Sequence, residues 1–195
     1  MNFSRREFVK LCMSSAAGAS LITILGPEFG KALGAAADGK PSVIWLQGAS
    51  CSGCSVSLLN SVEPKIEKVL LDIIGLKYHP TIMAGSGYLC EEVLEETAKK
   101  YKDQFILVVE GGIPTKDKGI YCTIAESDDR ELTMLQAVTT LGNMAQAVIA
   151  AGQCAAYGGI PGAAPNPTDV VGVSDVIQKK PVINIPLCPM HADHF

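Results

Sequence analysis

Four cysteines, three of them in glycine-rich segments, stand at spacings that would let them share one metal centre. Two form the pair Cys51-x-x-Cys54, and the other two are the isolated residues Cys154 and Cys188. Four thiolates can hold a tetrahedral zinc ion or an iron–sulfur cluster. Structural zinc usually takes two close pairs, whereas a cubane cluster is larger and accepts ligands from distant loops. The chemistry favours iron–sulfur and leaves zinc, disulfides and a Cys-x-x-Cys redox pair open.

The elements that must position these cysteines are the strands of a parallel sheet. Short, continuously apolar runs alternate with amphipathic stretches, a pattern typical of a sheet covered by helices on both faces. We expect strands at 42–46, 76–79, 105–109, 148–151 and 182–185, and helices at 56–60, 64–73, 91–100, 131–147 and near 173–178. In open parallel sheets the site lies beyond the carboxyl ends of the strands. The sequence therefore predicts an α/β fold with all four cysteines on one rim.

Two further cysteines need a separate interpretation. Cys90 and Cys122 do not follow any predicted strand, so we expect each to be a small, buried apolar thiol. Glu110 ends the central strand on the cysteine rim. Its carboxylate suits either proton movement or the capping of a loop, and the sequence does not separate the two.

The remaining candidates for chemistry give weaker signals. Trp45 lies within an apolar strand and is expected in the core. His79 is expected at the end of a strand on the protein surface. His191 and His194 fall within the last five residues, where a solvated side chain is the simpler expectation.

Residues 1–37 have the layout of an export signal. The segment Ser4-Arg5-Arg6-Glu7-Phe8-Val9-Lys10 precedes a moderately apolar run over 11–25, and small residues follow up to Ala37. The first segment closely resembles a twin-arginine signal, and the alternative is a basic amphipathic helix. The apolar run is too short and too rich in Ser and Gly to span a bilayer stably. We expect cleavage after Ala37 and export of a folded protein to the periplasm, with its cofactor already inserted.

Composition excludes several classes of protein. The chain has 195 residues, of which 48% are hydrophobic and 18% charged, so it can bury a sizeable core. Sixteen basic and 20 acidic residues give a net charge of −4, which argues against a nucleic-acid-binding surface. Seven dispersed cysteines do not resemble a small disulfide scaffold.

Four segments, in order along the chain, resemble the small subunit of nickel–iron hydrogenases. They are Trp45–Ser55, Glu110–Pro114, Gly152–Gly159 and Asn184–Pro189. Ala49, Ser50 and the stretch 55–60 look closer to the nickel–iron–selenium branch. The twin-arginine signal belongs to the same picture.

The resemblance implies a role for each rim cysteine. Cys51, Cys54, Cys154 and Cys188 would bind one proximal [4Fe–4S] cluster in a flavodoxin-like domain over residues 38–195. That cluster would carry electrons from the nickel–iron site of a separate large subunit towards an acceptor such as a cytochrome. This chain would itself hold no H2-cleaving residue. Oxygen-tolerant relatives have extra cysteines where this chain has Gly53 and Gly159, which implies an ordinary cubane and an oxygen-sensitive enzyme.

One departure from the family pattern concerns the region after Cys188. Exported relatives continue into a segment that binds medial and distal clusters, whereas this sequence ends at Phe195. We therefore expect the proximal cluster alone, in a one-cluster form or a truncated, non-functional fragment. Two related families fit less well. Cofactor-reducing soluble hydrogenases lack an export signal, so Arg5-Arg6 argues against them. Quinone-reductase subunits have adjacent cysteines at the first motif, so Cys51-x-x-Cys54 argues against them. An exported iron–sulfur carrier and a zinc-stabilised binding module are the alternatives from other classes.

Overall fold

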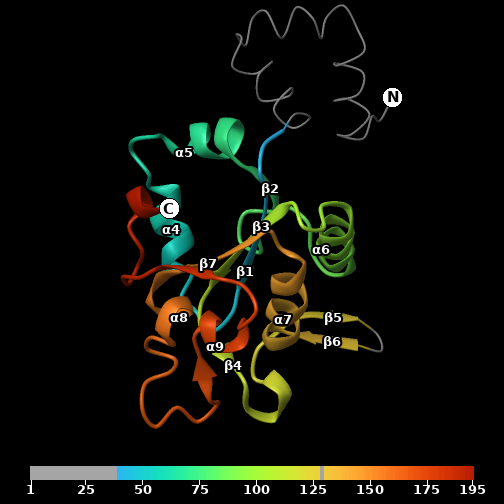
Figure 1. Cartoon of the computed structure of the whole chain (residues 1–195), viewed down its shortest axis with the longest axis vertical. Coiled ribbons are helices and arrows are strands. Elements are labelled where there is room, and N and C mark those ends of the chain that lie inside the picture. Colours follow the sequence, from blue (N-terminus) through green and yellow to red (C-terminus); the bar gives the residue numbers. More distant parts are fainter. Residues whose placement is uncertain (1–38, 128–129) are drawn as a thin grey trace, which may run out of the picture.

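Five parallel strands form the central sheet of the computed structural model, which describes residues 39–127 and 130–195 (Figure 1). In sheet order they are β2 (Gly75–Tyr78), β1 (Ser42–Gln47), β3 (Phe105–Glu110), β7 (Ala147–Ala151) and β9 (Val182–Ile185). All four pairings are parallel. Numbered among themselves, the strands follow the order 2-1-3-4-5, which is that of flavodoxin-like folds. The predicted strands and fold class are confirmed.

Helices cover both faces of the sheet, and each face has its own hydrophobic core. Successive side chains of a strand point to opposite faces, so Ile44 and Leu46 pack into one core while Val43 and Trp45 pack into the other. The first core is covered by α6 (Tyr88–Lys100), α7 (Met134–Met144) and α9 (Val173–Val176). The second is covered by α4 (Gly53–Leu59), α5 (Ile66–Lys68) and the π-helix η1 (Val69–Ile73).

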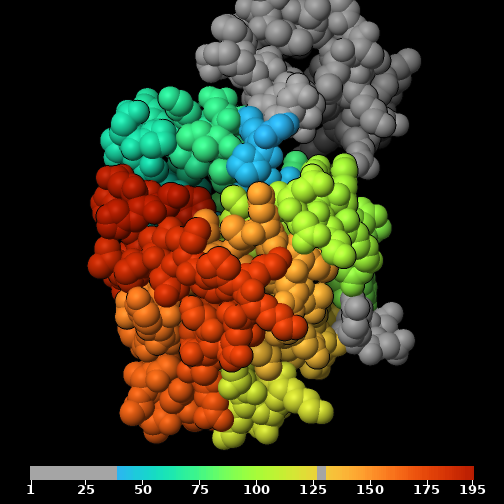
Figure 2. Space-filling model, in the orientation of Figure 1, coloured from blue at the N-terminus to red at the C-terminus, as the bar shows by residue number. Residues whose placement is uncertain are grey.

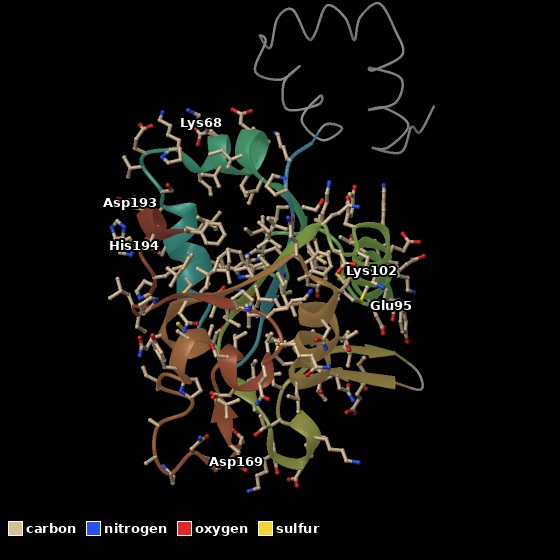
Figure 3. All side chains as sticks on the ribbon, in the orientation of Figure 1. Lys68, Glu95, Lys102, Asp169, Asp193 and His194 are labelled. Atoms are coloured by element: carbon tan, nitrogen blue, oxygen red, sulfur yellow. The ribbon has the colours of Figure 1, made fainter. Side chains whose placement is uncertain are left out.

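The helices carry polar side chains on their outer surfaces, whereas the strands between them are apolar. Figure 3 shows side chains filling both sides of the sheet, with Lys68, Asp169 and His194 at the outer edges. Figure 2 shows the C-terminal residues packed beside the segment that contains α4 and α5. Phe195 completes that packing, because its ring lies 5.4 Å from the Trp45 ring. Within the described residues, no helix is long and apolar enough to cross a membrane.

The prediction of one helix over 131–147 is wrong at both ends, because α7 stops at Met144 and Ala147 already belongs to β7. Residues 130–133 form strand β6 (Arg130–Thr133), which pairs antiparallel with β5 (Thr123–Ser127). Helix α7 begins only at Met134 because a capping box fixes its first turn. Thr133 Oγ1 accepts a hydrogen bond from the Gln136 backbone N–H, and the Gln136 side chain accepts one from the Thr133 N–H.

Short elements complete the fold. They are β4 (Ile113–Pro114) and β8 (Val170–Val171), which pair with each other, helix α8 (Gly152–Tyr157), and the 3-10 helices η2 (Lys116–Gly119) and η3 (Ala192–His194). The predicted helix over 64–73 is found as α5 and η1, and begins at Ile66. The predicted export signal lies outside the described residues.

Candidate metal centre

A pocket at the carboxyl ends of the strands brings the four predicted cysteines together. The pocket is open to solvent, and the empty space in it and at its mouth is about 370 Å³. Its wall consists of Ser50, Cys51, Gly53, Cys54, Glu110, Gly111, Ala151, Gln153, Cys154, Leu187, Cys188 and Pro189. These residues follow β1, β3, β7 and β9, so the pocket spans the position where the strand order reverses.

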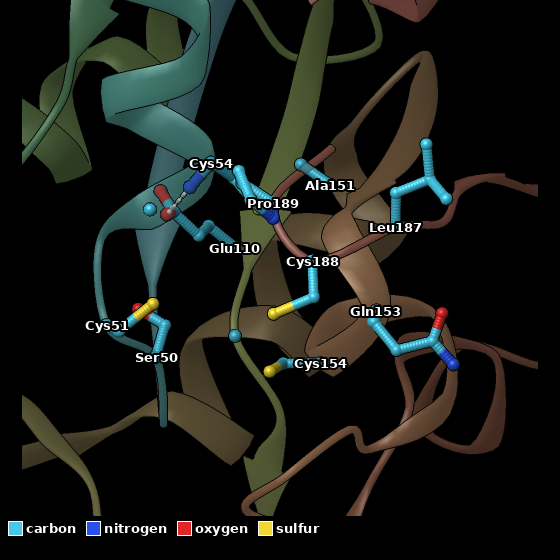
Figure 4. Close-up of a pocket in the computed structure, with 12 residues that line it drawn as sticks. Ser50, Cys51, Cys54, Glu110, Ala151, Gln153, Cys154, Leu187, Cys188 and Pro189 are labelled. Carbon is cyan, nitrogen blue, oxygen red and sulfur yellow. Dashed lines mark hydrogen bonds between the residues drawn. The ribbon is translucent and has the colours of Figure 1, made fainter. Parts of the chain in front are cut away.

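The four thiols reach the pocket from four different segments. Cys51 lies in the turn after β1 and Cys188 in the loop after β9, and both residues are exposed. Cys54 and Cys154 lie at the starts of α4 and α8 and are less exposed. Figure 4 shows the sulfurs of Cys51, Cys154 and Cys188 directed toward one common space. All six described cysteines are free thiols, so none of them is in a disulfide.

The spacing of these side chains fits a cluster better than a single ion. In residues 39–127 and 130–195, no group of three or more His, Cys, Asp or Glu side chains is placed to hold one metal ion. The thiols instead surround a pocket, and in a cubane each thiolate binds a different iron at the edge of a larger group. The donor set of four thiols and the shape of the pocket therefore suit a [4Fe–4S] cluster. The role of the four cysteines as ligands stays a prediction.

Burial disfavours the thiolate form of the two inner cysteines, Cys54 and Cys154, unless a cation is bound nearby. Burial, with smaller contributions from Glu110, Cys154 and Cys188, raises the pKa of Cys54 to about 11. Burial likewise raises the pKa of Cys154. Backbone N–H groups oppose this shift, since Met190 N lies 3.5 Å from Cys54 Sγ and the Ile160 backbone donates to Cys154. A metal that binds here would displace the thiol protons and find hydrogen-bond donors in place for the sulfurs.

Glycines press directly against three of the four sulfurs. A Cβ on Gly152 would lie 2.3 Å from Cys54 Sγ, and one on Gly159 would lie 2.7 Å from Cys154 Sγ. Both glycines also have positive φ, at +87° and +55°, which disfavours any other residue. A Cβ on Gly53 would lie 3.1 Å from Cys51 Sγ. The backbone therefore approaches the thiols as closely as side-chain-free residues allow.

Glu110 is a buried carboxylate that caps the first turn of α4. Its Oε1 accepts hydrogen bonds from Cys54 N at 3.0 Å and from Ser55 N at 3.1 Å. The N-cap residue Ser52 makes no side-chain cap, so Glu110 satisfies amides that the helix leaves unpaired. Oε2 accepts from Trp45 Nε1 at 2.9 Å and Gln47 Nε2 at 3.0 Å, and also from the Ser55 hydroxyl. These contacts favour the capping role over proton movement.

His79 is not on the surface, contrary to the prediction. Its residue is 2% exposed, and its ring stacks on Trp45 at 5.2 Å between centroids. Nε2 lies 3.1 Å from Ser55 Oγ, and Nδ1 accepts from Thr81 N at 3.2 Å. Burial lowers the pKa of His79 and so favours the neutral ring. The available signal was its place at the carboxyl end of a strand, on the same edge of the sheet as the cysteines.

The other candidates lie away from the pocket. Cys90 and Cys122 are half-buried and pack against the core under α6 and α7, as the sequence predicts. Cys90 Sγ contacts Met83 Sδ at 3.8 Å. His191 and His194 are exposed, which agrees with the prediction, and their rings lie 5.7 Å apart.

Comparison with known proteins gives one family. Residues 51–195 match the family described as NADH ubiquinone oxidoreductase, 20 Kd subunit. The chain is 43% identical over 202 residues to the periplasmic [NiFeSe] hydrogenase small subunit of Desulfomicrobium baculatum, covering 99% of this chain and 64% of that protein. It is 38% identical over 192 residues to the hydrogenase-2 small chain of Escherichia coli (strain K12), covering 98% and 50%.

Solved structures agree with these relatives. The recombinant [NiFeSe] hydrogenase from Desulfovibrio vulgaris Hildenborough, in the oxidized state, superimposes with a TM-score of 0.78 and 46% sequence identity. That match covers 81% of this chain and 57% of the other chain. The chain therefore spans about half to two thirds of the length of the relatives described here.

Proposed function

This chain belongs to the NADH ubiquinone oxidoreductase 20 kDa subunit family, and we propose that it is the electron-transfer (small) subunit of a nickel–iron hydrogenase. The observation that carries the proposal is the pocket in which Cys51, Cys54, Cys154 and Cys188 meet. Its support comes from relatives that are named as hydrogenase small subunits. The spacing Cys51-x-x-Cys54 also differs from the adjacent cysteines that we expect in quinone-reductase subunits.

The four cysteines would hold a single proximal [4Fe–4S] cluster. Such a cluster supplies one-electron redox chemistry. Cys54 and Cys154 would anchor its inner side, where burial keeps water away. Cys51 and Cys188 would bind it at the exposed mouth. The N–H groups of Met190 and Ile160 would donate to the inner sulfurs and so help to set the potential.

The partner would be a large subunit that carries the nickel–iron site and cleaves H2. The exposed thiols at the pocket mouth imply a covering surface, because an iron–sulfur cluster there would otherwise face water. Exposed apolar side chains stand on the segments that carry these cysteines. Leu187 lines the pocket, Ile160 lies in the loop whose backbone donates to Cys154, and Tyr157 is the last residue of α8, which contains Cys154. Ile160 is 79% exposed. A protein surface packed against these three side chains would exclude water from the cluster.

The cellular setting follows from the same proposal. Residues 1–37 would be a twin-arginine signal that directs folded export to the periplasm, and residues 38–195 would form the mature domain. An external carrier such as a cytochrome would take the electrons. Gly53 and Gly159 stand beside ligand sulfurs where oxygen-tolerant relatives have cysteines, so we propose an oxygen-sensitive enzyme. Undiminished H2 oxidation after exposure to oxygen would contradict that last point.

An anaerobic pull-down of the tagged full-length chain from its native host tests the proposal. We expect a large partner to co-purify, with nickel, iron and H2-dependent viologen reduction in the eluate. Cys188→Ser should lose the iron of the small subunit, while Cys90→Ser serves as the matched control and should retain it. About four irons per chain without a partner would indicate a lone carrier or an orphan fragment. Zinc in place of iron would refute the cluster.

A further inference from the structure

A buried polar network extends from the pocket wall, where Glu110 lies, into the adjoining core. Its members are Trp45, Gln47, Ser55, His79 and Glu110. Trp45, Ser55, His79 and Glu110 are each at most 2% exposed. The presence of the four thiols does not by itself require buried polar side chains here. A buried carboxylate carries an energetic penalty unless its hydrogen bonds are satisfied. The network therefore calls for a role of its own.

The direction of each hydrogen bond in the network can be derived. The Thr81 N–H donates to His79 Nδ1, so the ring proton of a neutral imidazole must be on Nε2. Nε2 then donates to Ser55 Oγ at 3.1 Å. Gln47 Nε2 also donates to Ser55 Oγ, at 2.9 Å.

These two donors determine where the serine proton goes. A hydroxyl has two lone pairs and one proton, and both lone pairs of Ser55 are occupied. Its proton is therefore directed to the one acceptor left, Glu110 Oε2, with which it makes a short contact. Glu110 is thereby fixed from one side and receives the Cys54 and Ser55 amides on the other.

We propose that His79 and Ser55 are positioning residues that keep the Glu110 carboxylate on the first turn of α4. Glu110 in turn holds the Cys51–Cys54 turn in the shape that presents both thiols to the pocket. The negative charge of Glu110, whose Oε1 lies 3.0 Å from the Cys54 backbone N, would also lower the reduction potential of a bound cluster. Only this effect on the potential rests on the proposed function.

The first test needs no cluster. Amide hydrogen exchange of the full chain is measured by NMR for Cys54 and Ser55, relative to the core amide of Val108. Glu110→Gln should speed exchange at both sites at least about tenfold. The glutamine side chain has an NH2 group in place of one carboxylate oxygen, and this group cannot accept hydrogen bonds from the donors that surround Glu110. His79→Phe keeps the ring on Trp45 but loses Nε2–H, and should speed exchange by a smaller, measurable factor. His79→Gln restores a donor and should return the rates toward those of the unmodified chain.

A control variant separates positioning from general destabilisation. Leu94→Ala removes a buried side chain from the opposite face of the sheet, so exchange at Val108 should accelerate with that at Cys54. The inference is overturned if His79→Phe and His79→Gln behave alike. It is also overturned if Cys54, Ser55 and Val108 all shift by the same factor in His79→Phe, as they would for a merely structural histidine.

The second test uses the chain loaded with iron and sulfide. The midpoint potential, followed by EPR, should rise in Glu110→Gln and by less in His79→Phe, and it should recover in His79→Gln. An unchanged potential in Glu110→Gln would overturn the electrostatic part of the inference. If the unmodified chain takes up no cluster, the proposed function fails, and the exchange measurement alone decides the positioning role.

Discussion

Cys154 and Cys122 are both half-buried free thiols, yet they lie in regions built for different purposes. Cys154 begins a helix at the pocket and shares that space with three other thiols. Cys122 precedes β5 and packs against the core under α7. For Cys122 burial alone raises the pKa, whereas for Cys154 Cys188, Cys51 and Glu110 add to burial.

Burial therefore does not distinguish a candidate ligand from a core thiol. What differs is the surroundings of the sulfur. Around Cys154 there are converging thiols, a backbone N–H donor and a glycine without a side chain. Around Cys122 there are apolar side chains, which disfavour the charged thiolate.

Replacing the thiols one at a time should break this comparison most strongly. Cys154→Ser and Cys188→Ser should each lose most of the bound iron and the EPR signal of the reduced cluster, because a serine oxygen is a poor substitute for a thiolate ligand. Cys122→Ser and Cys90→Ser should keep both. Iron retained in Cys188→Ser but lost in Cys90→Ser would show that the ligand set is wrong.

Adding one methyl group beside a sulfur should have the next largest effect. Gly152→Ala places a Cβ 2.3 Å from Cys54 Sγ at a φ of +87°, so we expect about 2–4 kcal/mol loss of unfolding free energy and little cluster uptake. Urea unfolding of the iron-free chain measures the first quantity. Gly39→Ala is the control, since Gly39 also has positive φ but nothing within 4 Å of its Cβ position. Equal losses in both variants would contradict the role of the Cys54 contact.

Thiol reactivity should sharpen the comparison in the iron-free chain. Burial raises the pKa of Cys122, so at pH 8 less of it is thiolate than for an ordinary cysteine. Iodoacetamide should modify Cys122 at least about tenfold more slowly than the exposed Cys51. Peptide mass spectrometry over time gives both rates. Comparable rates would show that Cys122 is not held in the core.

A change in the region of Cys122 should affect stability alone. Thr133→Ala removes the capping box of α7 and should lower the free energy of unfolding by about 1 kcal/mol. Iron content should not change, because α7 lies on the other face of the sheet from α4. Thr139→Ala is the matched control, since the hydroxyl of this exposed threonine within α7 donates to the Leu135 carbonyl of the same helix and its loss should be nearly neutral. A drop in iron content for Thr133→Ala would mean that the two regions are coupled.

The sheet and the rim of cysteines could be predicted because their signals are local. Runs such as 105–109 are continuously apolar, and glycine-rich turns directly follow β1, β3 and β7. The flavodoxin-like order and the four-cysteine rim follow from that alternation together with the family resemblance.

The parts that the sequence does not predict depend on non-local pairing. The sequence pattern predicts that the helix begins at residue 131, but residues 130–133 pair with β5. Only the Thr133–Gln136 capping box marks the start of the helix that is found. His79 reads as a surface residue because nothing near it in the chain shows that Trp45 and Ser55 will cover it. For Glu110 the sequence left proton movement and loop capping open. Its hydrogen-bond partners come from β1 and α4, which are distant from it in the chain.

The most direct measurement is the iron, sulfide and zinc content of the chain, purified anaerobically and loaded with iron and sulfide, with EPR of the reduced sample. A pocket built for one cubane predicts about four irons and four sulfides per chain and no zinc, with loss of the signal in Cys51→Ser. One zinc per chain, or undiminished iron in Cys51→Ser, would contradict the assignment of the four rim cysteines to a [4Fe–4S] cluster.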